Sequence, residues 1–328
     1  MPLQAHAQVA DSAALLMARA SEVDSNGVRV RPFEAESLYL RAAAIFRARR
    51  DVPNEAEALF GAARVIRGAP EVRGNTFDLR VIPLLRQAVA LFLSADSLAR
   101  AADALEAMST TIYTPRWTRD SVQQHRAHAL ALRRQVGDRV GAARILAQDS
   151  HYLSGFDDRI VTARRGVAAA RAVPDTLAEL LALNALGVAF IQGRSDTARA
   201  LNVRRAYRDS AVTYFAQGAR LARTAGNGRE EFTDLFNIIT LFQSTSVPAL
   251  RIRDSALYYA HEQLAAARRN PTLRSEASVL STIAALYQAY GAGDSAHACH
   301  HRNEIALIHR RELRSRDLFG HRGAAPVQ

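Results

Sequence analysis

Residues 183–190, Leu-Asn-Ala-Leu-Gly-Val-Ala-Phe, decide the fold of this 328-residue chain. Leu183, Leu186 and Phe190 stand at i, i+3 and i+7, which places all three side chains on one face of a helix. Gly187 lies inside that helix, where glycine costs about 1 kcal/mol relative to alanine. Close packing of a second helix is the compensation that we expect at this position.

The same apolar spacing returns five more times along the chain. The six sets are Leu59, Ala62, Ile66; Leu105, Met108, Ile112; Ile145, Gln148, Tyr152; Leu183, Leu186, Phe190; Leu235, Ile238, Phe242; and Ile283, Leu286, Tyr290, with Gln148 as the one polar member. Alanine, leucine and arginine dominate the composition, and only 7% of the residues are aromatic. Because alanine and leucine are strong helix formers, the sequence predicts an all-α fold.

An aspartate precedes each new helical run between these sets. The six are Asp78, Asp120, Asp157, Asp209, Asp254 and Asp294. Aspartate is a favoured N-cap, because its carboxylate accepts hydrogen bonds from unpaired N–H groups of the first turn. From each aspartate to the end of the next apolar set the distance is 32–36 residues, whereas the distance from a set to the following aspartate varies from 4 to 19. The constant block is therefore a hairpin of the second helix of one unit and the first helix of the next, and the turn inside each unit varies.

A repeated block of this length resembles the tetratricopeptide repeat. Residues 183–190 resemble the first-helix pattern of that repeat, and Ala211, Phe215 and Gly218 resemble its second-helix pattern of small, aromatic and small residues. Residues 140–173 are similar to the longer-helix variety of bacterial regulatory arrays. The resemblance covers residues 34–312, and it departs from the family in lacking the tryptophan and most of the glycines.

The resemblance implies a right-handed α-solenoid of about six helix pairs, or about fourteen helices, which binds a protein or peptide as a scaffold or sensor. Residues 1–30 are then a leader with a short helix, residues 31–316 the repeat array and residues 317–328 a flexible tail. No cofactor, metal ion or catalytic residue is predicted, and the chain is expected not to be an enzyme.

Tetratricopeptide arrays bind peptides in the concave groove that their first helices line. Carried onto this chain, the groove positions are Phe60, Arg64, Glu106, Thr110, Ser150, Asn184, Val188, Asn237, Thr240 and Gln288. Arg64, Asn184, Asn237 and Gln288 are the predicted partner-binding residues among them. An asparagine amide pairs with a peptide backbone through both its donor and its acceptor. The alternative is that Asn184 and Asn237 are simply solvated polar positions.

A second candidate surface is the edge formed by the turns inside the units, where insertions in repeat arrays collect. Residues 193–208 form the longest predicted turn and carry five arginines against one acid. Trp117, the only tryptophan, lies in another such turn. Trp117 and Arg204 are the predicted contacts, since tryptophan and arginine are enriched at binding hot spots. The alternative is that residues 198–206 extend the next helix and that Trp117 fills a gap between helices.

The charge leaves two further functions open. The formal net charge is +11, and all 43 basic residues are arginine. An arginine-rich nucleic-acid-binding repeat is one interpretation. An arginine bias spread over many helices is the other, and interleaved acids and bases such as Arg229-Glu230-Glu231 favour it, so nucleic acid is not the expected partner. The array is also compatible with an N-terminal sensor of a larger effector, such as a peptidase, kinase or ATPase.

Two short patterns suggest chemistry, and the sequence favours a structural explanation for both. His261-Glu262 begins like the zinc-protease motif, but Ala265 stands where its second histidine is required. A second cluster consists of His297, Cys299, His300, His301 and Glu304. Its four-residue spacings suit a metal on one helical face, but the solvated outer face of a terminal helix explains them without a metal.

The cellular compartment stays open. Ala5-His6-Ala7 resembles the cleavage box of a secretory signal, but the basic and apolar regions that precede such a box are missing. The chain is exported if its start codon lies upstream, and cytoplasmic otherwise. Cys299 is the single cysteine, which excludes an internal disulfide and fits either compartment. No stretch is expected to approach the roughly 20 apolar residues of a membrane-spanning helix.

Overall fold

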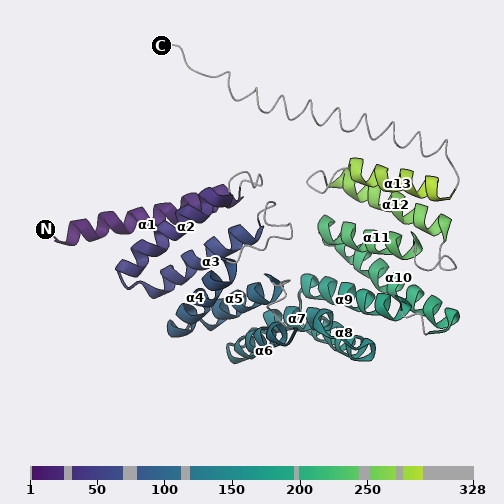
Figure 1. Cartoon of the computed structure of the whole chain (residues 1–328), viewed down its shortest axis with the longest axis horizontal. Coiled ribbons are helices and arrows are strands. Elements are labelled where there is room, and N and C mark those ends of the chain that lie inside the picture. Colours follow the sequence, from purple (N-terminus) through teal and green to yellow (C-terminus); the bar gives the residue numbers. More distant parts are fainter. Residues whose placement is uncertain are drawn as a thin grey trace, which may run out of the picture. The chain divides into compact units, whose positions relative to one another are not determined.

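The computed structural model describes residues 2–25, 32–68, 80–111, 119–195, 199–243, 252–270 and 276–290. Within these ranges the chain forms thirteen α-helices and one 3₁₀ helix, and no strand (Figure 1). The predicted all-α repeat fold is confirmed. The chain divides into two compact units, residues 1–153 and residues 154–328.

Unit 1 is a series of helices in which each member packs on the next along the chain. They are α1 (Pro2–Ser25), α2 (Pro32–Ala48), α3 (Val52–Gly68), α4 (Val81–Ser94), α5 (Leu98–Thr111), α6 (Arg119–Gln135) and α7 (Arg139–Gln148), followed by η2 (Asp149–Tyr152). Ala13 and Ala20 of α1 are completely buried in the core of this unit, in the segment that the sequence suggested as a leader.

Unit 2 follows the same plan of consecutive packed helices. They are α8 (Phe156–Arg171), α9 (Thr176–Ser195), α10 (Leu201–Thr224), α11 (Gly228–Gln243), α12 (Arg253–Arg269) and α13 (Glu276–Ala289). In the register of the repeat, α9, α11 and α13 are first helices, and α8, α10 and α12 are second helices. In unit 1, α3, α5 and α7 are first helices.

The hairpins of constant length correspond to α4–α5, α6–α7, α8–α9, α10–α11 and α12–α13, as predicted. Four of the turns between paired helices contain a residue with positive φ: Arg50, Asp96, Gly137 and Gly226. Such a left-handed residue reverses the chain within two or three positions, and glycine adopts it without a steric cost. The short turn fixes how each hairpin closes and therefore fixes its length.

The N-caps are not where the sequence placed them. Asp209 lies inside α10, Asp120, Asp157 and Asp254 lie in the first turns of α6, α8 and α12, and Asp78 and Asp294 fall outside the described residues. Side-chain caps instead begin first helices: Asp51, Asp138, Asp175 and Asn227 accept from the N–H groups of Asn54, Gly141, Ala178 and Glu230 at 2.8–3.4 Å. The tight turns expose these N–H groups, so the caps are required there. An aspartate in a first turn is still favoured, because it complements the helix dipole.

The interior glycines lie where two helices approach closely, as predicted. A Cβ atom on Gly187 of α9 would lie 2.7 Å from Cε1 of Phe215 on α10. A Cβ atom on Gly61 of α3 would lie 2.7 Å from Cε1 of Tyr39 on α2. Both contacts are shorter than a carbon–carbon van der Waals distance, so only glycine fits without a shift of the partner helix.

The predicted long turn over residues 193–208 is wrong, because α9 continues to Ser195 and α10 already begins at Leu201. The backward extension of the following helix, which was the alternative, is what occurs. The segment Thr176–Gly193 of α9 has the length and the apolar composition of a membrane-spanning helix, contrary to the expectation that no stretch would. However, 56% of that segment is buried inside the protein, as in the core helix of a packed domain.

Candidate functional site

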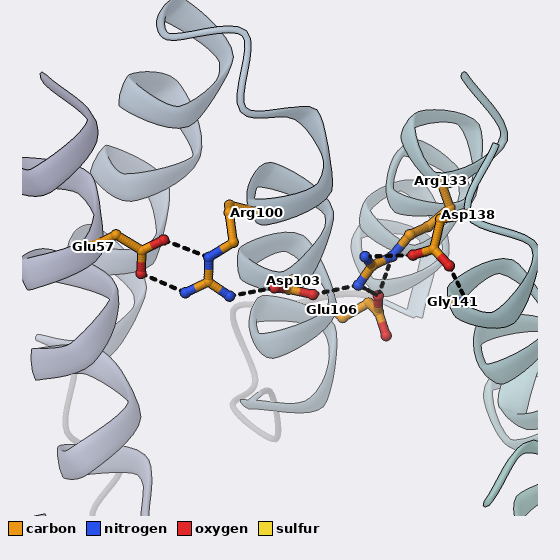
Figure 2. Close-up of polar contacts among 7 residues, drawn as sticks. All are labelled: Glu57, Arg100, Asp103, Glu106, Arg133, Asp138 and Gly141. Atoms are coloured by element: carbon orange, nitrogen blue, oxygen red, sulfur yellow. Dashed lines mark hydrogen bonds and ion pairs between the residues drawn. The ribbon is translucent and has the colours of Figure 1, made fainter. Parts of the chain in front are cut away.

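The first helices of unit 1 are joined by a network of charged side chains (Figure 2). Arg100 of α5 donates from Nε and Nη2 to the two carboxylate oxygens of Glu57 on α3, both at 2.5 Å. Asp103 then bridges Arg100 and Arg133 of α6. Arg133 also donates to Glu106 at 2.9 Å and to the N-cap carboxylate of Asp138 at 2.9 Å.

The charged groups of the network are paired with one another. The hydrogen bond to Glu57 holds the pKa of Arg100 above its usual value. Burial raises the pKa of Glu106, and the hydrogen bond from Arg133 opposes that shift. Charged groups that are held this way connect α3, α5, α6 and the start of α7, and they are costly to separate once partly buried. The network is therefore a structural brace across the first-helix face of unit 1.

The predicted groove residues of unit 1 are largely committed to that brace or to the core. Glu106 binds Arg133, and Thr110 accepts from Arg67 at 2.7 Å. Phe60 and Ser150 are buried, so neither lines an open groove. Arg64 remains exposed on α3. Sequence spacing alone missed this outcome, because it locates a helical face but does not say what the neighbouring helix contributes.

Unit 2 presents a different first-helix face, which contains no charged side chain. We call it the neutral face, and its members are exposed or half-buried: Leu177, Leu181, Asn184, Val188 and Ile191 of α9; Thr233, Phe236, Asn237 and Thr240 of α11; and Ser278, Ser281, Ala285 and Gln288 of α13. On each helix these positions recur three or four residues apart, apart from the adjacent pair Phe236-Asn237, so they share one side. Residues 180–193, 235–243 and 277–289 contain no charged residue at all.

The second helices of unit 2 differ sharply from the first. Exposed arginine pairs lie on each of them, at Arg164 and Arg165 of α8, Arg220 and Arg223 of α10, and Arg268 and Arg269 of α12. Exposed arginine pairs are therefore a feature of the second helices of this unit, whereas the first helix α11 carries the single exposed arginine Arg229 near its start. The neutral face is thus an uncharged stretch in a protein with a net charge of +11, and Arg229 and Glu230 lie one turn before its first residue on α11, Thr233.

Two side-chain contacts link the three helices of the neutral face. Asn184 of α9 donates from Nδ2 to Oδ1 of Asp234 on α11 at 2.7 Å. The hydroxyl of Tyr290, directly after α13, donates to the carbonyl of Phe242 at 3.3 Å, near the end of α11. Each first helix is thus tied to its neighbour.

Phe236 is the exposed aromatic ring of this face, with 50% of its surface accessible. Thr233 and Thr240, one turn to either side, donate their hydroxyls to the carbonyls of Arg229 and Phe236 in their own helix, each at 2.9 Å. Ser281 of α13 does the same towards Ala277 at 3.0 Å. Hydroxyls that are used in this way make the surface less polar than its composition suggests.

Asp234 lies beneath this face and is 1% exposed. Burial raises its pKa to about 7; the hydrogen bond from Asn184 opposes the shift, and the Glu230 carboxylate adds to it. Gly218 of α10 leaves the space that the carboxylate occupies, since a Cβ atom there would lie 2.1 Å from Oδ2. Sequence reasoning missed Asp234, because nothing in its local pattern distinguishes it from an exposed acid.

The predicted partner-binding residues fall in different places. Asn184 and Asn237 lie on neighbouring first helices of unit 2, and Gln288 lies on α13. One of the two N–H groups of the Asn184 amide is committed to Asp234, so only its second N–H and its oxygen are left for a peptide. Asn237 is half-buried on the neutral face, next to Phe236. Arg64 belongs to unit 1, and Trp117 lies outside the described residues.

The arginines near the start of α10 pack against aromatic rings. The Arg199 guanidinium lies 4.8 Å from the ring centroid of Phe156 and 5.6 Å from that of Tyr207. Buried Arg208 lies 5.6 Å from the ring of Phe242. Arg204 is half-buried in the first turn of α10, so this edge is helical and packed where the sequence suggested a loop.

No cluster of metal-ligating side chains occurs in the part of the chain that the structure describes. The His297–Glu304 cluster lies outside that part. In the described part of the chain, the neutral face of unit 2 is the candidate binding surface.

These features define a tetratricopeptide-like helical-repeat protein. No family model and no curated protein matches the chain. Among solved structures it is similar to a Signal Transduction ATPase with Numerous Domains protein with a tetratricopeptide repeat sensor, from Pyrococcus horikoshii, with 12% identity and a TM-score of 0.60 over 94% of this chain. The chain spans 44% of the length of that protein.

A second similar structure is a Rap protein complexed with Competence and Sporulation Factor. It shares 14% identity with a TM-score of 0.54, and the match covers 92% of this chain and 76% of that one. At such identities the likeness establishes the fold and leaves the partner open.

Proposed function

We propose that this chain is a non-catalytic binding module whose neutral face in unit 2 holds an extended segment of a partner protein. The segment is uncharged and inserts an apolar side chain against Phe236. One observation carries this proposal: a half-exposed phenylalanine among the uncharged residues of the neutral face, in a protein with 23% charged residues. Exposed apolar patches with a polar rim are typical of protein-binding sites.

The chemistry of the face selects for such a segment. Leu181, Val188 and Ile191 offer half-buried apolar surface on α9, the helix that Asn184 ties to α11. The Asn237 amide supplies a donor and an acceptor for the backbone of an extended chain. A charged segment would lose its hydration without gaining an opposite charge, so it is disfavoured.

The test is a selection from a random peptide library displayed on phage, with the full chain as bait. Enriched peptides should be uncharged and contain an apolar or aromatic residue. Phe236→Ser should weaken their binding at least tenfold, in the range of a hot-spot residue. Tyr258→Ser is the matched control, because Tyr258 is also an exposed aromatic residue, at 60%, but lies on the second helix α12.

Equal binding by Phe236→Ser and the parent chain would refute the site. Enrichment of acidic peptides only would refute the neutral face and point to the arginine-bearing second helices. Hydrogen exchange of the complex gives an independent check, since α9 and α11 should gain protection.

A second candidate is a sensor array that controls an effector domain. The likeness to an ATPase with a tetratricopeptide repeat sensor, of which this chain spans 44%, supports it. Cross-linking in the native organism should then join the chain to an ATPase, kinase or peptidase domain. Recovery of native complexes that contain no such domain would count against this role.

A further inference from the structure

One buried acid, Asp234, forms a hydrogen bond between α11 and α9. Asp234 is 1% exposed, and the hydrogen bond from Asn184 Nδ2 is its one hydrogen bond to a described residue. An ionised carboxylate has about four acceptor positions, and a buried one is stable only when several donors satisfy them. The site as built suits a neutral carboxyl group far better than a carboxylate.

The groups packed around Asp234 do not compensate a negative charge. Asn184 from α9 is neutral, and Gly218 from α10 has no side chain. Glu230, one turn earlier on α11, is itself acidic and disfavours a second negative charge. The other buried acid of this helix contrasts with it: Glu231 accepts from Arg223 and from Arg269, both at 2.7 Å.

We infer that Asp234 and Asn184 form a proton-operated clamp between α9 and α11. With a proton on Asp234 the junction stays closed. When the proton leaves, the buried carboxylate is stabilised by water, and water reaches it when the two helices separate locally. The clamp works in the range where burial has moved the pKa of Asp234, about 7.

The position of the clamp gives it a consequence for binding. Asn184 is a member of the neutral face, and Phe236 and Asn237 follow Asp234 within one turn. Proton release should therefore change the spacing of the residues that hold the partner. This consequence rests on the proposed function, whereas the clamp itself is tested without a partner.

The experiment is hydrogen exchange by mass spectrometry on the full chain at pH 6 and pH 8, corrected for the intrinsic pH dependence of exchange. With a folded pKa of about 7 and an ordinary value of 3.8 when open, local opening of α9 and α11 should be about tenfold more frequent at pH 8. Asp234→Asn should abolish that difference. Glu231→Gln is the matched control, a buried acid on the same helix, and should retain it.

Equal pH dependence in the parent chain and Asp234→Asn would overturn the clamp. A second measurement does not need a folded variant: carbon-13 NMR of the parent chain labelled at aspartate carboxyl groups. One resonance should titrate near pH 7, and a spectrum in which every aspartate titrates below about pH 6 would also overturn the clamp. Either failure leaves the peptide selection on Phe236 unaffected.

Discussion

Replacing Gly187 with alanine tests the helix contact on which the repeat depends. The new Cβ atom would lie 2.7 Å from both Cε1 and Cζ of Phe215 and 2.9 Å from Cδ1. Ordinary carbon contacts are about 3.5–4.0 Å, so the overlap approaches 1 Å. Phe215 is completely buried, and its ring cannot move away without displacing α10 or its neighbours.

Two opposing terms set the size of the effect. Overpacking of a tight core costs about 1–3 kcal/mol. Alanine returns about 1 kcal/mol of helix propensity relative to glycine. We therefore expect Gly187→Ala to lower the free energy of unfolding by up to about 2 kcal/mol, measured by urea denaturation with far-UV circular dichroism.

The contact can be isolated with a double-mutant cycle. Phe215→Leu removes part of the ring, so the two substitutions together should cost less than the sum of their separate costs. Gly61→Ala is the equivalent change in unit 1, where the Tyr39 ring takes the place of Phe215. A gain of about 1 kcal/mol from Gly187→Ala, as at an exposed helical site, would refute the contact. Strict additivity with Phe215→Leu would refute it as well.

Three further substitutions test the core, the buried acid and the charged network. Leu186→Asp places an unpaired carboxylate at a site that is 2% exposed, so it should abolish the cooperative unfolding of unit 2. Leu201→Asp, at an exposed position of α10, should leave the melting temperature nearly unchanged. Asp234 stays protonated in the folded chain up to about pH 7 but ionises above about 3.8 when unfolded, so its contribution to stability falls across that window, by roughly 4 kcal/mol. Urea unfolding of Asp234→Asn should lack this fall and give a more stable protein than the parent at pH 8; parallel pH profiles would contradict the assignment. Arg133→Met leaves three partly buried carboxylates without their shared partner and should lower the free energy of unfolding by about 1–3 kcal/mol. Arg171→Met, which removes an exposed ion pair, should lower it by less than about 1 kcal/mol. Equal losses in the two variants would contradict the brace.

The sequence predicted the helices and their pairing because both depend on local periodicity. Leu183, Leu186 and Phe190 are all buried in α9, as their spacing requires. The extent of α10 was missed, since the sequence alone does not distinguish an aspartate that caps a helix from an aspartate on an exposed helical face. Asp209 is of the second kind and lies far inside the helix.

The polar architecture was harder to predict, although one signal was available. An arginine in a second helix binds a glutamate eight residues later, across the tight turn, in Arg47–Glu55, Arg171–Glu179, Arg223–Glu231 and Arg268–Glu276. That spacing, with a capping residue between, recurs visibly in the sequence. Burial of Arg126 over Tyr152 had no such signal, because the hydrophobic pattern classifies arginine as exposed.

The neutral face could also be predicted in part from the sequence. The charge-free runs over residues 180–193, 235–243 and 277–289 stand out in a chain with 23% charged residues. The groove prediction considered single positions and therefore did not use these charge-free runs. Which neighbour each side chain meets, as Asn184 meets Asp234, depends on the packing of separate hairpins and is not encoded locally.

The hairpins of fixed length have a consequence for how such a chain grows. A duplicated hairpin would bring its own tight turn, its own cap and its own arginine–glutamate pair, so it would fold with the same closure as its parent. Each copy would add one first helix and one second helix, while the connections between hairpins absorb any mismatch in length. Gene duplication in whole hairpins would therefore lengthen the recognition surface in discrete steps and leave existing specificity intact.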